Sequence, residues 1–128
     1  MRVYDFGGVH KVDNITDLDQ LLRTRFGNGE NEFLLSHDFN DFPALSILVK
    51  GDLAAAYYFP RAGHAGFASV GEGTAFGRDG MTSFSTGSLG QAIEISNRAI
   101  IPISTALAVA REFFRCAELP RSIEWLEL

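Results

Sequence analysis

The chain is 128 residues long, 46% hydrophobic and 21% charged, with a formal net charge of −5. This length and composition are typical of one globular domain, so we expect a single domain over residues 1–128. The negative charge argues against direct nucleic-acid binding, which needs a basic surface; it suits a basic protein partner, although solubility alone also accounts for it. We expect no membrane-spanning segment, no signal peptide and, with a single cysteine, no internal disulfide, which together favour a bacterial-type cytosolic protein.

The first half of the chain predicts one helix between short strands. Apolar residues at helical spacing predict a helix over residues 16–25, with Thr16 as its N-cap. Alternating and short apolar runs predict strands over residues 2–4, 9–12, 32–38, 45–50 and 53–59. Lys50-Gly51 fits a tight hairpin turn between the last two strands. The three alanines at 54–56 have so little side-chain volume that we expect a helix to pack over them.

The middle of the chain is rich in glycine, since eight of the 13 glycines fall between Gly63 and Gly90. Strands are expected over residues 67–70, 81–86 and 92–96, with the irregular segment Gly71–Gly80 between the first two. The glycines of this segment are not spaced as in a dinucleotide-binding loop, and strand signals rather than a helix follow them. A surface loop is therefore the preferred interpretation.

The last third of the chain predicts a strand end, a helix and a final strand. The helix has an N-cap at Ser104, carries its apolar residues on one face and ends before a proline. Residues 122–127 alternate polar and apolar side chains, which predicts a strand whose tryptophan is largely buried against the helix. The residues expected to define this structure are two prolines, two helix aromatics and the tryptophan: Pro102, Phe113, Phe114, Pro120 and Trp125.

The order helix, hairpin-linked strands, helix and strand predicts an α+β fold. We expect a single antiparallel sheet of about five to seven strands with two helices packed on one face. The sequence contains no internal repeat or linker, which agrees with one domain.

No combination of residues satisfies the geometry that an active site needs. The segment Ser36–Asp38 contains the residue types of a catalytic triad, but neighbours on a strand point to opposite faces. The histidines, His10, His37 and His64, lack the spacing of metal ligands. Cys116 lies near a helix C-terminus, which disfavours a thiolate, and is interpreted as a packed small hydrophobe. We therefore expect no catalytic residue, metal or cofactor.

Two further groups have simple interpretations. Glu30 and Glu32 are paired carboxylates, but glycine and asparagine beside them suggest a solvated loop. The aromatic run at 57–59 lacks the interleaved basic residues of a base-stacking surface. We expect Tyr57 and Phe59 to face the core and Tyr58 to face outward.

From residue 44 onward, the most distinctive motifs lie near the C-terminus, in Ile101-Pro102, residues 106–114, residues 118–120, and Ile123 with Trp125. In these segments the chain resembles a family of immunity proteins of bacterial polymorphic toxin systems, the type commonly paired with nucleic-acid deaminase toxins. One departure is Ala117, where a glycine is expected to close the helix. Alanine accepts a left-handed cap less readily, so we expect the local turn to differ.

The resemblance implies function by binding: the protein would cover a toxin domain, block its substrate site and contribute no catalytic residue. Contacts are expected in the sheet-end loops, and a basic substrate cleft favours acidic and aromatic residues. Successive hairpin turns alternate between sheet ends, so these residues do not all form one patch. The candidate toxin-binding residues are Asp38, Asp41, Phe42, Arg61, His64, Glu72, Phe76, Arg78 and Asp79, with Glu72, Phe76 and Asp79 preferred.

Alternatives stay open at this point. Phe76 is either the anchor of the contact or a residue covered by its own loop. A small ligand-binding or enzymatic domain would use Gly71–Gly80, with Arg61, His64 and Arg78 converging on a polar pocket. A structural subunit would carry a large self-complementary apolar face. The expected partner is a toxin protein, without direct nucleic-acid or membrane binding, and no oligomeric state is predicted.

Overall fold

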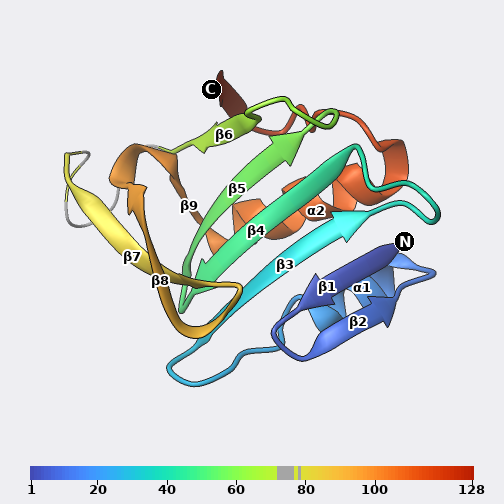
Figure 1. Ribbon diagram of the computed structural model, residues 1–128, viewed down its shortest axis with the longest axis horizontal. Helices are drawn as coiled ribbons and strands as arrows, with labels where there is room; N and C mark the ends of the chain where they lie inside the picture. The colour runs from blue at the N-terminus through green and yellow to red at the C-terminus, as the bar shows by residue number, and fades with distance from the viewer. Residues whose placement is uncertain (72–76, 78) are drawn as a thin grey trace.

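A computed structural model describes residues 1–71, 77 and 79–128 of the chain (Figure 1). Within these residues it has two α-helices, one 3-10 helix and ten strands. The helices are α1 (Ile15–Leu21), α2 (Ile103–Cys116) and the 3-10 helix η1 (Asn97–Ala99). The strands are β1 (Arg2–Asp5), β2 (Gly8–Lys11), β3 (Glu30–Ser36), β4 (Ala44–Lys50), β5 (Leu53–Phe59), β6 (Phe67–Val70), β7 (Met81–Thr86), β8 (Ser88–Ser96), β9 (Ile100–Pro102) and β10 (Glu124–Glu127).

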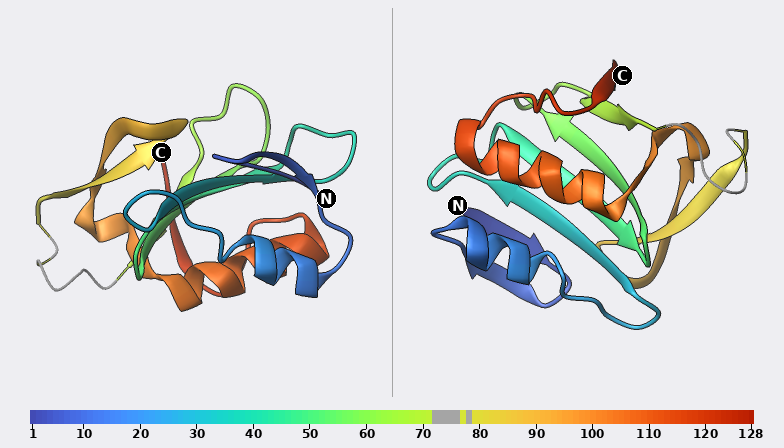
Figure 2. Two further views of the ribbon diagram at one scale, coloured as in Figure 1. Left: turned by 90° about the horizontal axis from the view of Figure 1, so that it is seen from below. Right: turned by 180° about the vertical axis from the view of Figure 1, so that it is seen from behind.

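The described strands form two sheets. Eight of them make an antiparallel sheet in the order β10-β6-β5-β4-β3-β1-β2, with β9 paired to β5. The other two, β7 and β8, form a separate two-stranded ribbon. In Figure 2 both helices lie on one face of the large sheet and the ribbon lies on the other.

The face that carries the helices holds the main core. Alternation along β3 and β4 buries Phe33, Leu35 and Ile47 on this side. Ala54 and Ala56 of β5 are fully buried there, and their small side chains leave room for α2 to pack closely. The expectation that a helix covers these alanines is confirmed.

The opposite face holds a second, smaller core beneath the ribbon. Phe84 and Ile95 of the ribbon are buried against Leu48 of β4 and Ala55 of β5. Because β3, β4 and β5 bury side chains on both faces, their sequences read as apolar runs rather than as a clean alternation.

Two carboxylates of β3 hold the ribbon in place. Glu30 accepts hydrogen bonds from the backbone N and the Oγ of Ser85, at 3.0 and 2.9 Å. Glu32 accepts from Oγ1 of Thr86 at 2.8 Å and from the backbone N of Gly87 at 2.9 Å. The interpretation of these two glutamates as solvated loop residues is therefore wrong, because both lie in a strand and bind another element.

The α+β class and the placement of both helices on one face are confirmed. The large sheet has more strands in the described residues than the expected five to seven, because the short strands β1, β2, β9 and β10 all pair with it. The last predicted strand, 122–127, is shorter and begins at Glu124. None of the described helices is long and apolar enough to cross a membrane.

Helix α1 begins one residue earlier than predicted, with a different cap. The N-cap is Asn14, whose Oδ1 accepts a hydrogen bond from the backbone N of Asp17 at 2.8 Å. Thr16 instead lies within the helix, since asparagine is at least as good an N-cap as threonine and stands two residues before it.

Helix α2 begins at Ile103 without a side-chain cap. Pro102 is its N-cap, so Ser104 is already helical and the predicted cap is wrong. The N–H of Ile103 donates to the carbonyl of Asp52 at 2.9 Å. Because β9 pairs with β5, the turn between β4 and β5 supplies this acceptor, and a tertiary contact takes the place of a local cap.

At its other end, α2 closes with Ala117 in the left-handed conformation, at φ 53°. Its N–H donates to the carbonyl of Phe113 at 2.9 Å. The local turn is thus the left-handed cap that a glycine would form, and it does not differ as expected. Cys116 just before it is exposed, so its interpretation as a packed residue is wrong.

The aromatic side chains depart from the prediction in two places. Tyr58 is buried on the helix side, 6.2 Å from the ring of Phe113, so it is Tyr57 and Phe59 that point to the opposite face. Trp125 packs against the main core but is half-buried rather than largely buried. It lies on the edge strand β10, and its Nε1 donates to the carbonyl of Pro120 at 2.7 Å.

Candidate functional site

The ribbon covers one part of the helix-free face, and no described helix or strand covers the rest. Cross-strand register places Tyr4, Leu34, Ser46 and Tyr57 in one row across β1, β3, β4 and β5. The next row holds Arg2, Ser36, Ala44 and Phe59. Directly paired residues share a face of the sheet, so the two rows form one surface, which we call the open face.

The open face is largely apolar and shallowly hollowed, with the guanidinium of Arg2 lying 5.5 Å from the centre of the Tyr4 ring. Tyr4 is 41% exposed and Leu34 is 40% exposed, although both lie inside strands. A hollow of about 490 Å³ lies over this surface. Its lining combines both rows with the loop that follows β3: Arg2, Tyr4, Leu34, Ser36, Asp41, Phe42, Ala44 and Phe59.

Two loops rise beside the open face. Figure 2 (left) shows the loop between β3 and β4, residues 37–43, and the loop between β5 and β6, residues 60–66, on the side of the sheet opposite the helices. The pairing of Ala44 with Phe59 places both loops at the same end of the sheet. The ribbon borders the open face at Tyr57, on the side away from these loops. We call the space between the loops and the ribbon the trough, and the open face is its floor.

The 37–43 loop carries two carboxylates and two exposed aromatic rings. Asp38 lies 3.3 Å from the amine of Met1, and Asp41 accepts a hydrogen bond from Arg2 at 2.9 Å. Phe39 is 100% exposed and Phe42 is 41% exposed. The structure therefore places Asp41 and Phe42 at the hollow over the open face, whereas Asp38 and Phe39 of the same loop line a separate hollow beside β2.

The predicted loop residues 61 and 64 lie at the same end of the sheet. Arg61 is exposed, whereas His64 is engaged within its own loop. The Nδ1 of His64 accepts from the N–H of Gly66 at 2.8 Å, and its Nε2 donates to Glu127 at 2.9 Å. Its ring stacks on Phe67 with centroids 5.2 Å apart. These contacts give His64 a structural role in the loop.

Asp79, the remaining described candidate, lies elsewhere. Its carboxylate is exposed and pairs with Arg98 at 3.2 Å, and its carbonyl accepts from Asn97. Figure 1 shows the start of β7 and the 37–43 loop at opposite sides of the molecule, so the candidates do divide between two ends of the sheet. Glu72, Phe76 and Arg78 lie outside the described residues.

The sequence reasoning missed the floor of the trough and the most exposed aromatic ring. The signal for the floor was present in β3, where Phe33, Leu34 and Leu35 are consecutive apolar residues. Such a run means that both strand faces are apolar, so a second surface must be covered or bound. Phe39 directly precedes Asn40 and Asp41, residue types that favour turns and so indicate that it lies in the same loop.

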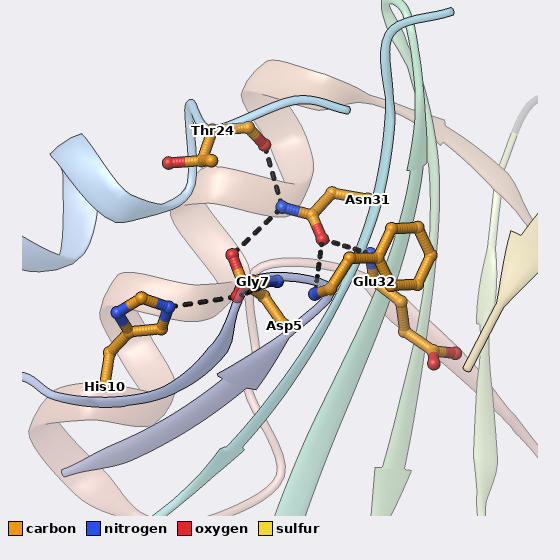
Figure 3. Close-up of polar contacts among 7 residues, drawn as sticks. Asp5, Gly7, His10, Thr24, Asn31 and Glu32 are labelled. Atoms are coloured by element: carbon orange, nitrogen blue, oxygen red, sulfur yellow. Dashed lines mark hydrogen bonds and ion pairs between the residues drawn. The ribbon is translucent and has the colours of Figure 1, made fainter. Parts of the chain in front are cut away.

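A buried polar cluster joins the β1–β2 hairpin to β3 (Figure 3). The fully buried Asn31 donates through Nδ2 to Asp5 at 3.2 Å and to the carbonyl of Thr24 at 2.9 Å. Its Oδ1 accepts from the N–H groups of Phe6 and Glu32. Every polar atom of this amide is bonded, as a buried amide requires.

Asp5 in the same cluster also pairs with the Nε2 of His10 at 3.0 Å. An aspartate that orients a histidine is part of many catalytic sites. The hydrogen bonds of the described residues give His10 no hydroxyl or thiol partner, and these residues contain no group of three ligands suited to a metal ion. The cluster has the geometry of a structural brace for the hairpin.

Burial affects the tyrosines on both faces of β5. It raises the pKa of Tyr57, on the floor of the trough. Burial, with a smaller contribution from the charge of Glu118, also raises the pKa of Tyr58 on the helix side. Both phenols are therefore neutral at ordinary pH, and the floor of the trough carries no charge from Tyr57.

Comparison with known proteins identifies relatives along the whole chain. The model of the family described as Immunity protein Imm1 matches residues 7–127. A double-stranded DNA deaminase immunity protein from Burkholderia cenocepacia (strain H111) is 27% identical over 128 residues, which covers 100% of both chains.

Proposed function

The chain belongs to the Imm1 family of immunity proteins, and from that premise we propose that it binds a cognate toxin domain, a deaminase that acts on nucleic acid, and blocks its active site. The observation that carries this proposal is the family match over residues 7–127. The full-length similarity to a relative named as a deaminase immunity protein supports the choice of toxin. An inhibitor of this kind acts by binding, so the protein needs no catalytic residue.

The charge and surface of the protein suit such a partner. An enzyme that acts on nucleic acid presents a basic cleft to the phosphate backbone. The inhibitor carries a net charge of −5, and Asp41 lines the hollow over the open face, with Asp38 in the same loop. Complementary charges accelerate encounter, while buried apolar and aromatic contacts supply affinity. The same negative charge argues against direct nucleic-acid binding by the inhibitor itself.

We propose that the toxin sits over the open face and the 37–43 loop. Three exposed side chains favour this surface, namely the rings of Tyr4 and Phe42 and the side chain of Leu34. The carboxylate of Asp41 lies beside them. Arg61 and His64 would border it from the 60–66 loop. The preference for Glu72, Phe76 and Asp79, with Arg78 beside them, stays a prediction for a second surface at the other end of the sheet.

The compartment follows from the mechanism. A deaminase that modifies nucleic acid meets its substrate in the cytoplasm of a bacterium, so we propose that the inhibitor works there.

We expect the cognate toxin to be encoded by a neighbouring gene, and the test uses the purified toxin domain of that gene product. That domain is assayed for deamination of a labelled oligonucleotide while purified inhibitor is added in steps. We expect activity to fall linearly and to vanish at one equivalent of inhibitor. Undiminished deamination at a large excess of folded inhibitor would show that the proposed function is wrong. A variant with an unrelated exposed substitution, Leu89→Ala on β8, serves as the matched control and should inhibit like the parent protein.

A further inference from the structure

Phe39 combines two features that the fold alone does not explain. Its side chain is 100% exposed, so the ring contributes no packing to the core. Its backbone has φ 69°, in the left-handed region that asparagine and glycine adopt readily and that is unusual for a bulky aromatic residue. Residues held in such conformations cluster at functional sites, where the surrounding structure maintains them.

The base of the loop is fixed, so the ring is presented in a defined place. The N–H of Asn40 donates to the carbonyl of His37 at 3.1 Å and forms a turn around Phe39. The Nε2 of His37 donates to the carbonyl of Phe113 in α2 at 3.2 Å, and the two rings pack at 5.4 Å. Thus the first residue of the loop is anchored in the main core, and the tip is held outside it.

Charges flank the ring on both sides in sequence. The side chain of Asp38 is 46% exposed and lies 3.3 Å from the amine of Met1. The side chain of Asp41 is 85% exposed and bonds Arg2 at 2.9 Å. These contacts position both carboxylates but leave much of their surface free. The tip of the loop therefore carries one exposed apolar ring, with a carboxylate on either side of it in the sequence, each held by an ion pair.

This arrangement matches the chemistry of a nucleotide. Enzymes that deaminate a base take it out of the stack into a snug pocket lined by aromatic and apolar side chains. The backbone on either side of that base carries negative phosphates that basic side chains contact. A planar ring with a carboxylate on either side of it in the sequence offers both kinds of contact.

We propose that the 37–43 loop inhibits the toxin by mimicking its substrate: the Phe39 ring occupies the base pocket, and Asp38 and Asp41 take the places of the flanking phosphates. This inference rests on the proposed function, because it requires a deaminase as partner. It adds the mode of inhibition, which is direct competition with the nucleic acid. The open face then packs against the surface of the toxin around the mouth of that pocket.

The sharpest test replaces the ring by a residue that suits the backbone. Asparagine tolerates the left-handed region, so Phe39→Asn should melt at a temperature equal to or above that of the parent protein. Removal of a central aromatic anchor should nevertheless raise the inhibition constant by at least about 30-fold. A residue with a merely structural role would not show this opposite effect on stability and on binding.

Two conservative variants distinguish a stacked ring from a general apolar contact. Phe39→Tyr keeps the flat ring and should inhibit within about threefold of the parent, because a base pocket stacks any ring of that size. Phe39→Leu keeps an apolar side chain without the flat ring and should lose at least about tenfold in affinity. Leu89→Ala again reports on an exposed apolar residue away from the loop and should leave inhibition unchanged.

The mode of inhibition is measured with the same oligonucleotide substrate. The apparent inhibition constant of the parent protein should rise in proportion to substrate concentration, as for a competitive inhibitor. If ring variants lose affinity while the parent inhibits without competition, the ring binds outside the base pocket and the inference is wrong. If Phe39→Asn inhibits as well as the parent, the inference is wrong while the proposed function stands.

Two further outcomes have separate meanings. A parent protein that fails to bind the toxin domain at all would refute the proposed function and, with it, this inference. Sedimentation of the inhibitor alone tests a second copy of this chain as the occupant. A dimer of the parent that Phe39→Asn converts to a monomer would assign the ring to self-association and overturn the inference.

Discussion

The two parts of the helix-free face are built from the same strands but have different surroundings. Under the ribbon, Leu48 and Ala55 are buried by Phe84 and Ile95. On the neighbouring strand β3, Leu34 stays 40% exposed in the open face. The ribbon and the strands beneath it form a second core in the covered part. The open part is also largely apolar, but no described helix or strand packs over it.

From this difference we expect stability and recognition to depend on separate parts of the molecule. Glu30 and Glu32 fix the ribbon over one part of the face by four hydrogen bonds. Because the ribbon stops there, Tyr4 and Leu34 stay exposed. Exposed apolar surface inside a sheet is a common mark of an interaction site. Substitutions in the two parts should therefore affect different measurements.

The largest effect is expected in the covered part, at Phe84. This ring is buried between ribbon and sheet, so Phe84→Ala should lower the free energy of unfolding by about 3–5 kcal/mol. Chemical denaturation followed by circular dichroism measures the change. A loss below about 1 kcal/mol would show that the ribbon does not contribute a core, and the comparison between the two parts would break down.

A smaller loss of unfolding free energy is expected when the hydrogen bonds that hold the ribbon are removed. Glu30→Ala removes the acceptor for the backbone N and Oγ of Ser85, which is buried. The unsatisfied donors should cost about 1–3 kcal/mol of unfolding free energy. Glu32→Ala should cost less, because one of its partners, Gly87, is exposed to water. Equal losses at the two glutamates would contradict this account.

In the open part, a substitution is expected to weaken toxin binding and to leave stability nearly unchanged. Leu34→Ala should change the unfolding free energy by no more than about 1 kcal/mol, since its side chain is already much exposed. The same variant should weaken toxin binding by tenfold or more if its side chain is buried in the complex. Calorimetric titration with the toxin domain measures this loss, and parent-like affinity would remove Leu34 from the interface.

The smallest effect concerns Tyr57, at the border of the two parts. Burial raises the pKa of this phenol above its ordinary value of 10.0. The folded state thus favours the neutral form, and its contribution to stability is present below pH 10 and lost as pH rises above it. Tyr57→Phe should extend the stable range slightly to higher pH, measured by melting temperatures between pH 8 and about 11.5. If the variant and the parent lose stability at the same alkaline pH, ionisation of Tyr57 does not limit stability there.

Much of the fold could be predicted from local sequence patterns. The predictions were wrong where residues distant in the sequence determine the structure. The hairpin at Lys50-Gly51 and the apolar face of α2 depend on neighbours in sequence, and both were predicted correctly. The predicted cap of α2 was wrong because Asp52, in the turn between β4 and β5, supplies the acceptor. Tyr58 was assigned to the wrong face because β5 is apolar on both sides, so its alternation gave no direction.

The candidate site shows the same division. The loop position of Asp38, Asp41 and Phe42 could be predicted because turn residues mark a loop in the sequence itself; their contact with a toxin stays a prediction. The floor beside them was missed because Tyr4, Leu34 and Phe59 come from three strands and meet only through the register of the sheet. Whether Glu72, Phe76 and Asp79 also contact the toxin stays a prediction.

Amide hydrogen exchange on the complex tests the central claim most directly, namely that the toxin covers the open face and the 37–43 loop. The amides of residues 38–42 should exchange rapidly in the free protein and be protected when the toxin domain is bound. Amides at the tip of the ribbon, residues 87–91, should exchange alike in both states. Protection confined to the ribbon tip or to the amides of residues 79–81, with residues 38–42 unchanged, would contradict the account.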